Sequence, residues 1–456
     1  MMGEPPKQQG QFFYQFNLDE HIPQDHLLRQ IESVLDLSTL REHLAPYYSH
    51  TGRPSVDPEL MMRMLLIGYC YGIRSERRLC EEVNMNLAYR WFCRLSLEDK
   101  VPDHSTFSKN RHGRFRDSDV FRFVFEQVLQ RCMSEGLVGG EGFAVDASII
   151  KADASRQRHH EDDDDWGDGG GTRAVREYLD ALEETDKPIK HVSSTDPCSR
   201  YTAIRGGPAF YAYSTNYLTD VDAGIIVDVE PTPAYRPAEV EATKTMIERV
   251  EARFKMKPKR LLGDTAYGAA KFVAWMVDDK LIEPHVPLWE KGERSDGSYS
   301  RSDFIFDPDS DSFTCPGGKQ LKRFWRNFKK QRTGVTKANA IHYRARASDC
   351  SSCPMKARCC PNTLLRKVSR SVHETARDVV RGIHATAKYQ QSLRERKKVE
   401  MLFGHLKRIL KLDRLRLRGM TGAHDEFLLA AIAQNLRRMV KYVAQGPPTA
   451  AKAVPT

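Results

Sequence analysis

The sequence predicts a protein of mixed α/β class, in which an all-helical N-terminal domain precedes a mixed sheet with flanking helices. Apolar residues recur at helical spacing as far as about residue 133. At 142–150 the period changes to the two-residue alternation of a strand. Strand patterns and helical patterns then alternate up to about residue 288. This order of elements is typical of a sheet that is covered by helices.

The composition favours a folded, basic protein. Lys and Arg number 71 against 61 Asp and Glu among 456 residues, and the sequence pI is about 9.0. This balance fits a polyanionic partner and fits an ordinary basic protein equally well. The most apolar stretch, LMMRMLLIGYCYGI, is short and contains Arg63, and the N-terminus has no apolar segment. We therefore expect a cytoplasmic protein that has neither a membrane span nor a signal peptide.

Residues 1–138 are predicted to form the helical N-terminal domain. Asp57 directly before Pro58 is a typical helix start, and apolar residues follow at helical spacing. A later helix, which begins near VPDHS, is basic and carries Lys109 and Arg111. A compact DNA-binding domain has this pattern, and so does a helical domain that only packs or oligomerises.

An acid stands inside the first predicted strand. In GFAVDASII, Phe143 and Val145 share one face of the strand, and Asp146 lies on the other. Because a buried carboxylate needs a partner, Asp146 is a candidate functional residue. The low-complexity segment 159–171, HHEDDDDWGDGGG, is expected to be a disordered, solvated loop.

The rest of the chain, residues 139–445, is predicted to form one domain around the sheet. Its further elements are a hairpin at 209–232 with a turn at Asp222–Gly224, a helix at 237–254, a strand RLLGD that ends at Asp264, a helix at 269–278, a strand at 283–288 and a helix at 394–410. A basic, cysteine-containing insertion occupies about 290–380, and the tail 446–456 is expected to be disordered.

The helix RERKKVEMLFGHLKRIL carries an acid among cations. At 100° per residue, one stripe is apolar and contains Val399, Phe403, Leu406 and Leu410. A second stripe beside it contains Arg396, Glu400, Lys407 and Lys411. Glu400 thus borders the core with cations in line on either side. The simpler interpretation of Arg396 and Glu400 is a solvated surface ion pair.

These residues together carry a resemblance. The segments FAVDASIIKA, STNYLTDVDAGIIVDVEPTPA and LLGDTAYG, with the pattern RxxxExxxxxxK at Arg396, Glu400 and Lys407, resemble DDE transposases of bacterial insertion sequences. PSVDPELMMRMLLIGYCYGIRS and VPDHSTFSKNR are similar to the helical domain that precedes the catalytic domain in such proteins. The similarity spans Pro54 to Lys441. One departure is Leu393, where these transposases often carry tyrosine.

The resemblance implies a ribonuclease H-like catalytic domain, strand cleavage and strand transfer of a mobile element. It implies that Asp146, Asp264 and Glu400 are catalytic and bind two Mg²⁺ or Mn²⁺ ions, which suit all-oxygen ligands. Terminal inverted repeats and target DNA are the implied partners, with the protein acting as an oligomer at the nucleoid. The residues expected to contact DNA are Arg396, Lys407, Arg408, Lys411, Lys109 and Arg111.

The insertion contains a cysteine cluster. Cys315 precedes DCSSCPMKARCC, and the spacing allows a structural zinc site at Cys315, Cys350, Cys353 and Cys359. Free structural thiols fit the irregular spacing equally well.

Two other functions remain open at this stage. One is a metal-dependent nuclease that cuts without strand transfer, and the other is a catalytically inactive, transposase-derived DNA-binding protein. A nucleophilic serine, histidine or tyrosine fits less well, because no nucleophile elbow surrounds Ser148 and the three acids favour metal chemistry.

Overall fold

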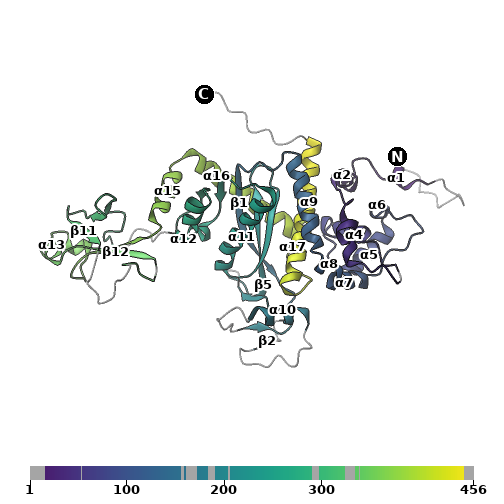
Figure 1. Ribbon diagram of the computed structural model, residues 1–456, viewed down its shortest axis with the longest axis horizontal. Coiled ribbons are helices and arrows are strands. Elements are labelled where there is room, and N and C mark those ends of the chain that lie inside the picture. Colours follow the sequence, from purple (N-terminus) through teal and green to yellow (C-terminus); the bar gives the residue numbers. More distant parts are fainter. Residues whose placement is uncertain are drawn as a thin grey trace, which may run out of the picture. The chain divides into compact units, whose positions relative to one another are not determined.

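A computed structural model of the protein describes residues 16–52, 54–155, 159–160, 172–182, 191–203, 206–289, 297–323, 334–337 and 339–445. The chain divides into two compact units, one of Met1–Lys257 with Glu395–Thr456 and one of Pro258–Arg394. The tail and most of the acidic loop, residues 161–171, lie outside the described residues. Figure 1 labels the elements of both units.

Short helices form the N-terminal part of the first unit. They are α1 Leu18–His21, α2 Leu27–Val34, α3 Leu40–Leu44, α4 Pro58–Cys70, α5 Glu76–Met85, α6 Leu87–Phe92, α7 Ser105–His112, α8 Arg114–Asp117 and α9 Val120–Ser134. The predicted start of α4 is confirmed, because the Asp57 side chain accepts a hydrogen bond from the Glu59 N–H at 3.3 Å. None of the described helices is long and apolar enough to cross a membrane.

The sheet of the first unit is antiparallel. It contains β4 Arg200–Thr202, β5 Phe210–Asp220, β1 Gly142–Lys151 and β6 Ile226–Pro233. β5 is central, since β1, β4 and β6 all pair with it. The predicted hairpin is confirmed: β5 and β6 are joined at a turn where Asp220 Oδ1 accepts from the Asp222 and Ala223 N–H groups. β2 His159–His160 and β3 Val192–Ser193 form a separate small sheet.

Helices cover both faces of this sheet (Figure 1). α11 Arg236–Phe254 lies on one face, where Ser214 Oγ of β5 donates to Glu239 Oε1 at 3.2 Å. α17 Gly419–Gln445 packs on α9, α4 and β6. The Asn435 amide of α17 bonds both the N–H and the C=O of Ile226, each at 2.8 Å, and so fixes α17 to the first residue of β6. α10 Arg173–Leu182 also packs on α17.

The second unit has two parts. In one, β7 Arg260–Leu262 and β8 Glu283–His285 are parallel and lie with α12 Ala270–Ala274, a π-helical turn Trp275–Asp279 and α15 Glu374–His384. The other is a five-stranded antiparallel sheet in the order β13-β12-β11-β10-β9. Its strands are β9 Ile305–Asp307, β10 Ser312–Thr314, β11 Gln320–Arg323, β12 Ala340–Arg344 and β13 Lys367–Ser371, and α13 Ala347–Ser351 and α14 Lys356–Cys359 follow β12.

The five-stranded sheet has its own apolar core, which makes the predicted insertion a folded lobe. The core contains Phe304, Phe313, Leu321, Tyr343, Ala345, Cys350, Cys360 and Val368. α16 Ala387–Arg408 follows α15, and its residues from Glu395 onward belong to the first unit.

Candidate active site

Asp146 lies on the sheet face that α16 covers. In the β1–β5 register Asp146 is directly opposite Tyr217, and residues directly opposite in an antiparallel pair point to the same face. The Tyr217 ring stacks on Phe403 of α16, with ring centroids 5.5 Å apart. α11 lies on the opposite face, that of Ser214. Asp146 is half-buried, and its Oδ1 accepts from the Ala147 N–H at 2.9 Å.

Two lysines fix α16 to the sheet. Lys398 Nζ donates to Val221 O, just beyond the end of β5, and Lys407 Nζ donates to Ile149 O of β1, each at 3.1 Å. The apolar stripe of the helix is buried as predicted, with Phe403 only 8% exposed. Burial lowers the pKa of Lys407, against the opposing effect of Asp413. Lys407 was expected to contact DNA. In the structure its side chain instead donates a hydrogen bond to the backbone of β1.

Glu400 lies between these two attachments. It precedes Phe403 by three residues, about 4.5 Å along the helix axis. Phe403 stacks on Tyr217, the residue directly opposite Asp146, so Phe403 packs on the sheet beside the position of Asp146. The Glu400 side chain is 59% exposed, and Arg396 Nη2 lies 3.6 Å from its Oε1. The surface ion pair of the simpler interpretation is thus present, with the carboxylate open to solvent. The helix ends at Arg408, so the predicted stripe stops before Lys411, which has a left-handed φ of 56°.

Asp264 belongs to the second unit. It follows β7 and begins the turn Thr265–Gly268, where its Oδ1 accepts from the Ala266 N–H at 2.8 Å. Gly268 holds this turn in a close contact, because a Cβ at that position would lie 1.9 Å from the Pro287 carbonyl oxygen. The position of the half-buried Asp264 is therefore fixed within its own unit.

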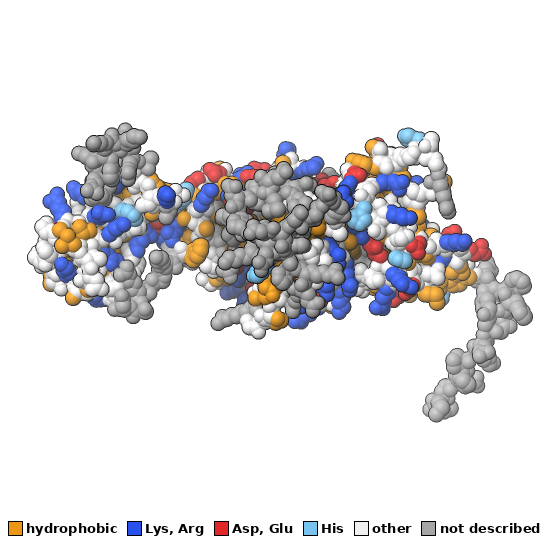
Figure 2. All heavy atoms as spheres, turned by 90° about the horizontal axis from the view of Figure 1, so that it is seen from below, with side chains coloured by type: hydrophobic (Ala, Val, Ile, Leu, Met, Phe, Trp, Pro, Cys, Tyr) orange, Lys and Arg blue, Asp and Glu red, His pale blue; other side chains and the backbone are white. Residues whose placement is uncertain are grey.

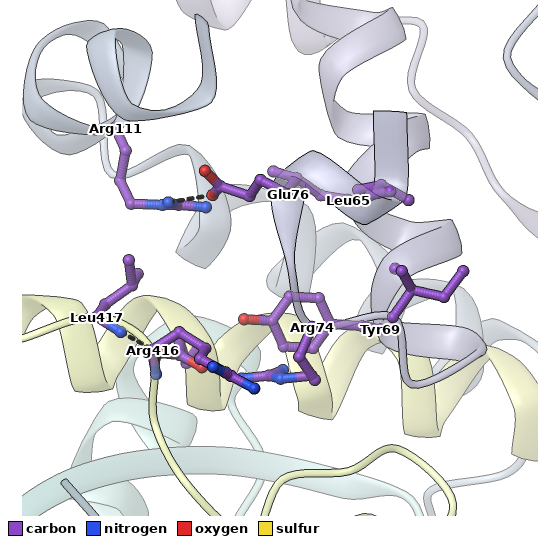
Figure 3. A pocket seen from close by; sticks show the side chains of 11 residues that line it. Leu65, Tyr69, Arg74, Glu76, Arg111, Arg416 and Leu417 are labelled. Atoms are coloured by element: carbon purple, nitrogen blue, oxygen red, sulfur yellow. Dashed lines mark hydrogen bonds and ion pairs between the residues drawn. The ribbon is translucent and has the colours of Figure 1, made fainter. Parts of the chain in front are cut away.

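Of the two expected DNA contacts in the N-terminal part, one is exposed and one is buried. Lys109 is exposed on α7, whereas Arg111 is buried and forms an ion pair with Glu76. Figure 3 shows Arg111 at the wall of a pocket with Tyr69 and Arg74. The pocket volume of about 30 Å³ suffices for water and not for a nucleobase.

All five cysteines of the predicted cluster lie around one cavity. It is lined by Cys315, Cys350, Cys353, Cys359 and Cys360, so Cys360 joins the four expected ligands. The Lys319 N–H lies 3.3 Å from Cys315 Sγ. Burial raises the pKa of Cys359 to about 11. Among the described residues, no three His, Cys, Asp or Glu side chains are arranged to hold a metal ion.

Sequence reasoning missed the residues that position the acids. Tyr217 and Lys398 show no catalytic pattern, and their roles depend on strand register and on which strand a helix crosses. The alternation along 210–220 does indicate that Tyr217 lies on the opposite face from Ser214. Its position opposite Asp146 has no signal in the sequence.

Comparison with known families supplies the identity. A model described as "Transposase domain (DUF772)" matches residues 16–113, and a model described as "Transposase DDE domain" matches residues 314–440. The protein is a DDE transposase. The DDE match contains Glu400 and the cysteine cluster, whereas Asp146 and Asp264 lie before it. DDE domains generally use divalent metal ions.

The transposase also has distant similarity to solved structures. A piggyBac transposase synaptic complex with hairpin DNA is 8% identical with a TM-score of 0.33, and the match covers 92% of this chain and 75% of that one. A Mos1 transposase paired-end complex with the left transposon end is 10% identical with a TM-score of 0.17, and the match covers 52% of this chain and 60% of that one.

Proposed function

We propose that the transposase cleaves DNA at the ends of an insertion sequence and joins it to target DNA by metal-dependent phosphoryl transfer, using a ribonuclease H-like catalytic domain. One observation carries the proposal. Asp146 lies on the sheet face that α16 covers. Glu400 is on α16, within one turn of Phe403, which stacks on the Tyr217 ring opposite Asp146. An exposed carboxylate thus stands on the helix that covers the sheet face of Asp146.

Asp146, Asp264 and Glu400 are the proposed metal ligands. Carboxylate oxygens suit Mg²⁺ or Mn²⁺, and two such ions would activate the attacking oxygen and stabilise the leaving one. The exposed Glu400 carboxylate and the half-buried Asp146 fit ligands that must meet both an ion and a phosphate. The chain itself holds these acids in place, through Phe403 for Glu400 and the Thr265–Gly268 turn for Asp264.

Exposed cations near the proposed site and in the helical domain supply phosphate contacts. Arg408 and Lys411 are exposed at the end of α16, Arg396 is partly exposed, and Lys109 is exposed on α7. Contacts of this kind fix the register of DNA without reading its sequence, and they weaken as salt rises. The terminal repeats and target DNA are the proposed partners. We propose that at least two copies of the chain act together when the two ends are paired.

The test replaces Glu400 with glutamine, which keeps its size and removes its charge. We expect Glu400→Gln to bind terminal-repeat DNA as tightly as the wild type and to lose strand cleavage in Mg²⁺ by at least about 100-fold. Glu241→Gln is the matched control, because Glu241 is also an exposed helical acid in an ion pair, with Lys244 at 3.0 Å. Normal cleavage by Glu400→Gln would refute the assignment.

A labelled donor DNA separates the alternatives. Joined donor–target products support a transposase, whereas cleavage without joining indicates a nuclease. If the wild type binds DNA and neither cuts nor joins it in Mg²⁺ or Mn²⁺, the protein is a binding protein that descends from a transposase.

A further inference from the structure

The lobe formed by the five-stranded sheet has one face packed and one face open. Leu321, Tyr343 and Val368 of three adjacent strands are buried in the lobe core. Their neighbours Lys322 and Lys367 point the other way and are exposed. The open face therefore belongs to side chains that the fold of the lobe does not need for its core.

Three cations form a row across this face. Lys322 of β11 is directly opposite Arg344 of β12, and Arg344 is directly opposite Lys367 of β13. Adjacent strands are about 4.8 Å apart, so the row spans about 10 Å. The pKa of His342, on the same face of β12, is lowered by its burial and by nearby Lys367 and Arg344, which agrees with this placement.

The row has no acid within it. β11, β12 and β13 contain neither Asp nor Glu. Among the described residues, no ion pair involves Lys322 or Lys367. An acid, Asp307, stands at the far end of the same row on β9, and its carboxylate accepts from Ser310 Oγ at 2.6 Å.

Such a row costs stability. Like charges directly opposite on neighbouring strands repel one another and destabilise a sheet. A polyanion that lies across the strands would offset this repulsion. Roughly three phosphates of one DNA strand fall within 10 Å of duplex axis, which matches three cations over the same span. Figure 2 shows Lys and Arg side chains on the visible side of this lobe.

We propose that the row Lys322–Arg344–Lys367 is a DNA backbone contact, so that the cysteine-bearing lobe is a second DNA-binding surface of the transposase. The proposal rests on the proposed function only in taking DNA as the partner. The contact is sequence-independent, and its residues are other than those of the proposed catalytic site and of the helical domain.

The test is the salt dependence of DNA binding by the full-length protein. The triple variant Lys322→Gln, Arg344→Gln, Lys367→Gln is compared with the wild type on a short duplex of random sequence, without added Mg²⁺ or Mn²⁺, between about 50 and 200 mM salt. We expect the slope of log K against log salt to fall by about 2 to 3, because each lost phosphate contact removes about 0.9. A single cooperative melting transition near that of the wild type shows that the variant is folded.

The matched control removes the same charge elsewhere. Arg253, Lys255 and Lys257 are exposed around the end of α11, and their triple replacement by glutamine should leave the slope nearly unchanged. An unchanged slope in the Lys322, Arg344 and Lys367 variant would overturn the proposal. So would equal loss in both variants, which indicates only a net-charge effect. Loss of binding to anionic vesicles with full retention of DNA binding would overturn it as well.

Because neither Mg²⁺ nor Mn²⁺ is added, this experiment does not depend on catalysis. A wild type that binds DNA through the row and fails to cut it refutes the proposed function and leaves the surface intact. If the triple variant still cleaves DNA at saturating protein, catalysis is intact and only the DNA-binding surface has been removed.

Discussion

Glu374 offers a quantitative test of how the second unit is held together. Its side chain is 1% exposed at the start of α15. Oε1 is 2.6 Å from Arg301 Nη1 and 2.7 Å from Arg381 Nη2, and Oε2 is 3.2 Å from Arg377 Nη1. Burial alone would raise the pKa of this carboxyl, yet Arg381, Arg301 and Arg377 together lower it from 4.5 to about 2. The folded unit therefore strongly favours the charged form.

The sign and size of the pH effect follow. Because the folded pKa lies below the unfolded one, this stabilisation is complete above pH 4.5 and is lost as pH falls towards 2. Its full size is about 3 kcal/mol, at about 1.4 kcal/mol per pKa unit. Between neutral pH and about pH 3.5 the wild type should lose roughly 1.4 kcal/mol of it.

The assay is hydrogen exchange of second-unit amides in Glu374→Gln. The variant should be destabilised by about 3–5 kcal/mol at neutral pH, since it leaves three arginines without their carboxylate. It should also lose this part of the pH dependence. Asp378→Asn is the control, because Asp378 is 53% exposed on the same helix and pairs with Arg381. Its loss should stay below about 1 kcal/mol. Equal losses in the two variants, or an unchanged pH dependence in Glu374→Gln, would refute the reasoning.

Two further predictions concern the same unit. We expect elemental analysis of purified protein to find about one zinc ion per chain. The zinc should be lost in Cys353→Ser, because Cys353 lines the five-cysteine cavity, and kept in Cys80→Ser, because Cys80 lies on α5. Metal-free wild-type protein would show that the thiols are free. Gly268→Ala should abolish cleavage and lower the melting temperature, since its Cβ meets backbone at 1.9 Å, whereas Gly382→Ala on α15 meets nothing within 4 Å and should stabilise by about 0.5–1 kcal/mol. A Gly268→Ala variant with normal melting and cleavage would contradict the role given to the turn.

Local patterns predicted the elements around the acids well. The strand that contains Asp146, the hairpin after it and the α16 stripe with Phe403 all follow from periods of two and 3.6 residues. The structure has the strand and the hairpin at nearly the predicted bounds, whereas α16 begins at Ala387, seven residues before the predicted start at 394. The pattern succeeds here because each element buries one face and shows its period in the sequence.

Such local patterns could not predict contacts between residues that are far apart in the chain. Lys407 and Arg111 were expected to contact DNA because they are cations on basic helices. In the structure Lys407 donates a hydrogen bond to a β1 carbonyl, and Arg111 forms an ion pair with Glu76. A long side chain reaches either solvent or a buried partner from the same helical position, and only the tertiary fold decides which. The cation row of the lobe was missed for the same reason, since it depends on strand register.

The position of α17 affects when the first unit is able to fold. This helix packs on α4, α9 and β6, yet it begins at Gly419, 349 residues after α4 ends at Cys70. At a synthesis rate of about 5–20 residues per second, α4 waits roughly 17 to 70 seconds on the ribosome for α17, and α9 and β6 wait for shorter times. During that time their apolar surfaces are uncovered, so nascent chains need protection from aggregation, and truncated messages should yield insoluble products.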